Sequence, residues 1–149
     1  MEITSSAFQH FGMIPKKYTC DGENINPPLS VLDAPAETQS LAIIMDDPDA
    51  PGGLFTHWVI WNIDAGVGMI AEGEVPSNSV EGINSANTIG YFGPCPPSGT
   101  HHYHFRFYAL DKVLEIGPDS GKDELIEAMD GHVLASEEFV GLYSRGEAV

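Results

Sequence analysis

The chain has 149 residues, 42% of them hydrophobic and 19% charged, and 22 Asp and Glu against 6 Lys and Arg give it a formal net charge of −16. A surface this acidic repels nucleic acid and anionic lipid at long range, so nucleic-acid binding is not expected. The length predicts one domain, residues 1–149, with a single sizeable core. We see no apolar run long enough to span a membrane and no signal peptide, which predicts a cytoplasmic protein.

The first third of the chain predicts short strands separated by turns. Residues 1–12 begin as a short strand, 14–19 are extended, and the prolines in 26–31 favour an edge or initiating strand. Residues 40–45 are a continuous apolar run, which predicts a strand buried on both faces. The next segment, 46–51, holds three Asp and two Pro, which is typical of a turn and excludes a central strand.

Residues 56–63 predict another strand. Strict alternation of side chains predicts that one face of this strand carries His57, Val59 and Trp61. The opposite face carries Trp58 and Ile60. The connection that follows, 64–90, is rich in Gly, Ser and Asn, and a compact domain keeps so long a connection only for a reason.

A Gly- and Pro-rich loop, residues 90–100, leads into a strand over 101–110. Alternation predicts two faces for this strand: His101, Tyr103, Phe105 and Phe107 against His102, His104, Arg106 and Tyr108. The first face is polar at the loop end and apolar further along. The strand can therefore place His101 and Tyr103 at the rim of a pocket while the rest packs the core.

The last segments predict a helix over 121–130 and a strand over 133–143. Ser120 is the expected cap, Gly131 the expected end, and the expected buried face is Leu125, Ile126 and Met129. Many short strands and one late helix predict a mainly β protein. The expected fold is an antiparallel Greek-key β-sandwich with one or two short helices near the C-terminus.

Cys20 and Cys95 have neither a zinc-site spacing nor that of a Cys-x-x-Cys redox pair. Two reduced thiols are the favoured interpretation, because a cytosolic compartment keeps thiols reduced. Both residues lie in turn-rich segments, so a disulfide that joins two loops is the alternative.

Two segments concentrate unusual polar groups: Asp47, Asp49 and His57 in one, His101 and Tyr103 in the other. Both adjoin strand ends through proline-containing loops, where a β scaffold places binding residues. Imidazole N–H and phenol O–H groups are donors suited to an oxyanion such as phosphate, and a nearby Asp fixes a histidine tautomer. If the loops meet, they form one anion-binding pocket.

The polar residues also allow two alternatives to anion binding, a hydrolase active site and a metal site. Asp47 and His57 could act as the acid/base pair of a hydrolase, but the only local nucleophiles are Ser98, Thr100 or a water, and no Gly-x-Ser-x-Gly elbow is present. His102 and His104 share a strand face without an evident third metal ligand. We therefore expect no enzyme activity, no catalytic residue, no cofactor and no metal.

These segments resemble the two signature regions of the phosphatidylethanolamine-binding protein family, more narrowly its prokaryotic Raf-kinase-inhibitor-like branch. The residues that carry the resemblance are Asp47-Pro-Asp-Ala-Pro51, His57-Trp58 and the segment from Gly93 to Tyr103. Further segments that fit the branch are 15–22, 26–30, 128–135 and 141–145. The resemblance covers nearly the whole chain.

The resemblance implies a β-sandwich whose pocket binds phosphate-like anions or phospholipid head groups, with a regulatory role. It implies pocket residues Asp47, His57, His101 and Tyr103, a wall of Pro96, Pro97 and Phe55, and support from Asp49 and Pro51. It also suggests a protease or kinase as protein target, and a homodimer.

Two positions depart from the family pattern. His102 stands where the family usually has Arg, which weakens a positive rim at the pocket. The C-terminal helix that lines the site in eukaryotic members has no match, so Tyr143 is not assigned to the site.

Overall fold

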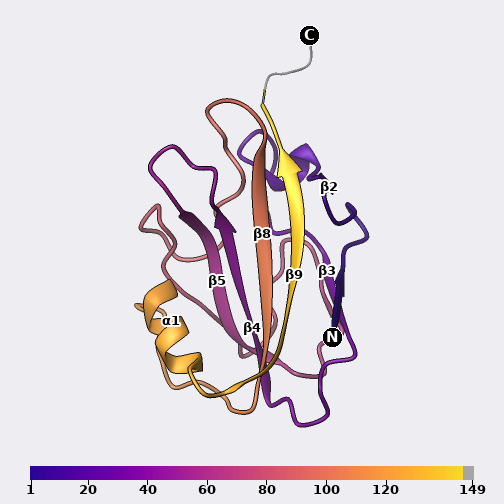
Figure 1. Cartoon of the computed structure of the whole chain (residues 1–149), viewed down its shortest axis with the longest axis vertical. Coiled ribbons are helices and arrows are strands. Elements are labelled where there is room, and N and C mark those ends of the chain that lie inside the picture. Colours follow the sequence, from indigo (N-terminus) through magenta and orange to yellow (C-terminus); the bar gives the residue numbers. More distant parts are fainter. Residues whose placement is uncertain (146–149) are drawn as a thin grey trace.

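A computed structural model describes residues 1–145, in which two β-sheets enclose the main core (Figure 1). The larger sheet has the order β2 (Gly12–Met13), β9 (Val133–Tyr143), β8 (His101–Leu110), β4 (Ser40–Asp47), β5 (Phe55–Asp64) and β7 (Val80–Glu81). The smaller sheet has the order β1 (Glu2–Thr4), β3 (Leu29–Leu32) and β6 (Met69–Ile70). Of the strand pairs described, β2–β9 is parallel and the others are antiparallel.

The larger sheet contains the predicted Greek key. Strands β4, β5 and β7 lie side by side in this order, with β6 of the smaller sheet between β5 and β7 along the chain, and β8 returns to pair with β4 on its other side. The mainly β, Greek-key sandwich predicted from the sequence is therefore confirmed.

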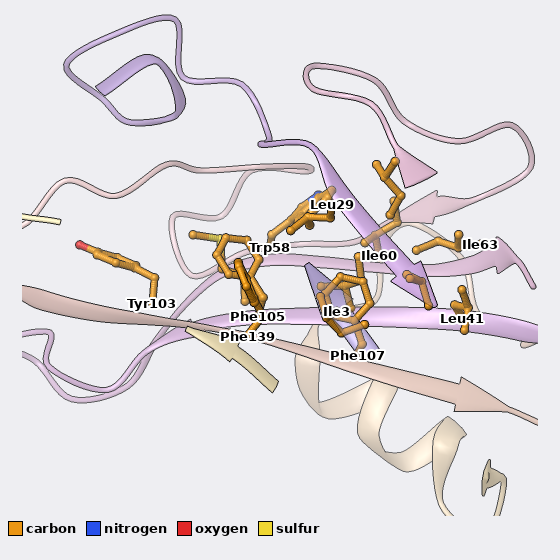
Figure 2. Close-up of a cluster of buried hydrophobic side chains, with 14 of the residues drawn as sticks. Ile3, Leu29, Leu41, Trp58, Ile60, Ile63, Tyr103, Phe105, Phe107 and Phe139 are labelled. Carbon is orange, nitrogen blue, oxygen red and sulfur yellow. The ribbon is translucent and has the colours of Figure 1, made fainter. Parts of the chain in front are cut away.

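Strand β4 lies at the centre of the molecule and is buried on both faces, as its apolar run predicts. Ile43 and Met45 belong to the core between the sheets, part of which Figure 2 shows. Ala42 and Ile44 belong to a second apolar cluster on the opposite face, where helix α1 (Lys122–Met129) packs. One strand thus connects both cores.

Strands β8 and β9 have the predicted bounds, and other elements differ. The segment 14–19 contains a 3-10 helix, η1 (Lys16–Tyr18), and the long connection after β5 contains the short strands β6 and β7. Strand β4 continues through Asp46 and Asp47. The prediction from composition, a turn over 46–51 and no central strand, is therefore wrong at these two residues. Both carboxylates are buried there because cationic or hydrogen-bonding partners face them.

The predicted helix is present, with two corrections. The backbone N–H of Gly121 donates to the Glu124 carboxylate at 2.7 Å, so Gly121 takes the cap position expected of Ser120. Leu125 and Met129 are buried, whereas Ile126 is 46% exposed and is not part of the buried face. Among residues 1–145, no helix is long and apolar enough to cross a membrane.

This difference on the helix predicts unequal effects of two similar substitutions. Leu125→Ala should lower the free energy of unfolding by about 2–5 kcal/mol, because it leaves a cavity between α1 and the sheet. Ile126→Ala removes an exposed side chain and should change it by about 0.5 kcal/mol or less. Urea unfolding of both variants measures the two values, and equal losses would contradict the observed packing of the helix.

Candidate functional site

The two polar segments singled out in the sequence meet at one end of the larger sheet. Strand β4 ends there, β5 begins there after a short loop, and β8 begins there after the proline-rich loop (Figure 1). A cavity of about 140 Å³ lies between these loops. It is lined by the four predicted polar residues, Asp47, His57, His101 and Tyr103.

The wall of the cavity is mostly apolar. Phe55, Pro96 and Pro97 lie in it as expected, and Pro51, expected only as support, lines it directly. Three lining residues were not assigned to the pocket from the sequence: Ala50, Phe92 and Cys95. Ala50 and Cys95 lie within the segments that carry the family resemblance, and Phe92 directly precedes one of them. No lining residue is Lys or Arg, so positive charge in the cavity has to come from a protonated imidazole.

A β-bulge brings His57 into the cavity. Strict alternation predicts that His57 shares the α1-facing side of the sheet with Val59 and Trp61. The pairing shifts by one residue between Met45–Trp58 and Asp46–Thr56, so His57 is the extra residue on its strand. Its ring consequently lies beside Tyr103, with 5.2 Å between ring centroids.

The orientation of the His57 ring is set by the main chain. Its Nδ1 donates to the carbonyl oxygen of Phe92 at 2.5 Å, and the Phe92 N–H donates back to the His57 carbonyl at 3.0 Å. Because a carbonyl only accepts, the proton of the neutral ring is on Nδ1. Burial lowers the pKa of His57, and the Phe92 carbonyl and Asp47 only partly offset that effect.

His101 is held by a carboxylate instead. Its Nδ1 donates to Asp47 Oδ2 at 2.6 Å, and both side chains are buried. The other oxygen of Asp47 accepts the backbone N–H of Asp49 at 2.8 Å. Asp47 therefore fixes the tautomer of His101, with the proton of the neutral ring on Nδ1.

Tyr103 presents an unpaired hydroxyl. The residue is fully buried, and its Oη has no hydrogen-bond partner in the described chain. Figure 2 shows this oxygen directed away from the apolar cluster. Burial and the nearby carboxylates of Asp47 and Asp49 raise the Tyr103 pKa; the backbone N–H of Cys95 opposes this slightly but does not reach hydrogen-bond geometry. The phenol therefore stays protonated as a donor, and a buried donor without a partner favours a ligand or water.

Cys95 in the cavity wall forms a disulfide with Cys20, with 5.5 Å between the Cα atoms. The interpretation favoured from the sequence, two reduced thiols, is therefore wrong. Two turns 75 positions apart come together because the loop before β8 packs on the η1 segment, where Cys20 N–H donates to the Pro94 carbonyl at 3.1 Å. The spacing of the cysteines could not show that contact.

Asp49 and the two other histidines of β8 lie outside the cavity lining. Asp49 accepts hydrogen bonds from the backbone and ring of His102, which join the loop after β4 to the start of β8. His104 Nδ1 lies 3.1 Å from Glu138, but the contact lacks hydrogen-bond geometry. Within residues 1–145, no group of three candidate metal ligands is found. Tyr143, not assigned to the site, donates to Asp21 at 2.7 Å.

Comparisons with known proteins agree with this fold. The family model described as phosphatidylethanolamine-binding protein matches residues 4–144. A UPF0098 protein of Methanothermobacter thermautotrophicus is 52% identical, with 98% of this chain and 100% of the relative covered. A UPF0098 protein of Chlamydia muridarum is 47% identical, with 97% and 99% covered.

Two solved structures are similar over nearly the whole chain. A phosphatidylethanolamine-binding protein homolog from Chlamydia trachomatis is 45% identical with a TM-score of 0.93, covering 96% of both chains. Escherichia coli YbcL, described as a new member of the mammalian family, is 27% identical with a TM-score of 0.89, covering 96% of this chain and 97% of its own. The resemblance seen in the sequence is confirmed, and this chain belongs to the phosphatidylethanolamine-binding protein family.

Proposed function

We propose that the cavity binds a small phosphate-type anion, free or as a phospholipid head group, without catalysing a reaction, and that occupancy has a regulatory role. The observation that carries this proposal is the buried, unpaired hydroxyl of Tyr103 next to two histidine rings. A tetrahedral oxyanion offers acceptors for a phenol O–H and an imidazolium N–H at once.

The apolar wall of the cavity is suited to an organic substituent on the bound anion. Phe55 and Phe92 lie beside His57, with ring centroids 4.7 Å and 5.9 Å from it, and Pro96 and Pro97 complete the wall. Low local polarity strengthens the interaction between a buried donor and an anion. A free phosphate and a phosphate ester share this chemistry, and titration with inorganic phosphate and with glycerophosphoethanolamine distinguishes them.

The lining residues favour binding over catalysis. Neither Ser98 nor Thr100 lines the cavity, and the sulfur of Cys95 is held in the disulfide. A hydrolase would have to use a water activated by a histidine. We expect no turnover of aryl phosphates or aryl esters, and turnover that Asp47→Asn abolishes would contradict a purely binding role. Inhibition of a protease or kinase stays a prediction, tested by a direct assay.

Phosphate affinity should fall as the pH rises from about 5 to 8, by up to about tenfold per pH unit for each proton that the complex holds and the free site does not. The affinity is expected to fall rather than rise with pH, because an anion beside the Asp47 carboxylate needs a protonated partner. Burial lowers the His57 pKa, so protonation of that ring contributes only below its ordinary value of 6.5.

Calorimetry with inorganic phosphate measures this pH dependence. Resonances of the His57 and His101 rings should shift during the titration. A pH-independent affinity, or shifts confined to residues outside the cavity, would contradict the proposed site.

A further inference from the structure

The two nitrogens of His57 have different roles in the cavity. Nδ1–H is committed to the Phe92 carbonyl, in a pair that the Phe92 N–H reciprocates. No hydrogen bond to Nε2 is found in the described part of the chain, and the residue lines the cavity. A neutral His57 therefore offers the ligand a lone pair and no proton.

His57 resists protonation despite its neighbours. The residue is 4% exposed, and this burial outweighs the attraction of the nearby carboxylates. The titratable groups near the two histidines come from β4 and its following loop, from β8 and from β9: Asp47, Asp49, Tyr103 and Tyr143, with Asp46 on the opposite face of β4. Protonation of His101 disfavours protonation of His57 further, since like charges repel.

His101 is suited to the opposite role. Its Nδ1–H is paired with the Asp47 carboxylate at 2.6 Å, so a proton added at Nε2 creates a cation beside a fixed negative charge. No hydrogen bond to this Nε2 is found in the described residues, and the ring lines the cavity. When His101 holds this second proton, the site combines two donors, His101 and Tyr103, with one acceptor, His57.

From this arrangement we propose that His57 accepts a hydrogen bond from a hydroxyl on the bound anion, so the cavity selects oxyanions that carry an acidic proton over those that carry none. The favoured class is inorganic phosphate and the monoanions of phosphate monoesters and phosphonic acids, which keep one P–OH. The disfavoured class is anions without an acidic proton: sulfate esters, sulfonates and phosphodiesters such as phospholipid head groups. The inference rests on the proposed function, and it adds that His57 determines which anions bind.

The physical basis is the pairing at Nε2. In a phosphate monoester monoanion, one P–OH donates to His57 while the other oxygens accept from His101 and Tyr103. A sulfate ester has only acceptor oxygens, so it either faces the lone pair of His57 or forces a proton onto that buried ring. Because a hydrogen bond is replaced by a repulsive contact, we expect a difference of about tenfold or more in affinity.

Methyl phosphate and methyl sulfate test this selectivity. At about pH 5 both are tetrahedral monoanions, since the second pKa of a phosphate monoester is about 6. Calorimetry of the full-length wild-type chain should show methyl phosphate binding about tenfold or more tightly. Nitrogen-15 NMR of the methyl phosphate complex should show His57 still neutral with its proton on Nδ1.

His57→Gln supplies an amide N–H near the position of Nε2 and should bring the two affinities to within about threefold. Asp111→Asn is the matched control. Asp111 pairs with His132 Nδ1 at 2.8 Å and follows the opposite end of β8, so its substitution should leave the ratio unchanged. If the Gln variant fails to fold, the wild-type affinities and the His57 NMR signals still decide the matter.

The outcomes separate the inference from the proposed function. Methyl sulfate binding within threefold of methyl phosphate by the wild type, or a protonated His57 in the methyl phosphate complex, would overturn the role of His57 while anion binding stands. Failure of both anions to bind across the pH range would overturn anion binding itself, and the selectivity with it.

Discussion

Reduction of the Cys20–Cys95 disulfide is expected to lower the free energy of unfolding by about 4.5 kcal/mol. The bond joins residues 75 positions apart, so it removes much of the conformational freedom of the unfolded chain. The folded state keeps the contacts between the two turns, such as Cys20 N–H to the Pro94 carbonyl and Tyr91 Oη to the Tyr18 carbonyl. The loss therefore arises mainly in the unfolded state.

Urea unfolding with and without a thiol reductant measures this contribution. The double variant Cys20→Ser, Cys95→Ser should be as unstable as the reduced wild type, and reductant should not change it further. A reduced wild type within about 1 kcal/mol of the oxidised one would show that the loop-closure effect is small here.

Asp46→Ala is expected to cost about 3 kcal/mol of stability, since it leaves two cations without their shared buried partner. Asp46 is fully buried on the α1-facing side of β4. Its Oδ2 accepts from Arg106 at 2.7 Å and from Lys122 at 2.8 Å, and its Oδ1 accepts from Thr56 at 2.9 Å. The arrangement joins β4, β5, β8 and α1, so its loss affects all four elements.

Urea unfolding of Asp46→Ala and of Asp111→Ala compares a buried with an exposed carboxylate. The exposed pair of Asp111 and His132 should contribute about 0–1 kcal/mol, because solvent screens it. Asp46→Asn, which can still accept from Thr56, should fall between the two. Equal losses for Asp46→Ala and Asp111→Ala would contradict the structural importance of the buried charge.

Local patterns in the sequence were sufficient to predict much of the β scaffold and the end of the helix. The alternation in residues 101–110 predicted β8 and its inward-facing His101 and Tyr103, because a strand has a period of two wherever it lies. The apolar run in 40–45 predicted a strand buried on both faces, and Gly131 marked the end of the helix. Each of these features depends on the chemistry of a few consecutive residues.

The polar members of the site could also be named, since they follow recognisable motifs. Their wall could be named only in part: Ala50, Phe92 and Cys95 lie in the same loops as the named wall residues, but only the packing of those loops shows that they line the cavity. The cytoplasmic location, the homodimer and the absence of a cofactor stay predictions.

By itself, the sequence determined the family, the main strands and helix, and the four polar residues of the cavity. Only the tertiary structure decided that Asp46 and Asp47 continue a central strand, that Cys20 meets Cys95, and that His57 faces the cavity. The reason is that each depends on partners far along the chain: cations for Asp46, a loop for Cys20, and the bulged pairing with β4 for His57. The Phe92 carbonyl, 35 residues after His57, then sets which ring nitrogen the ligand meets.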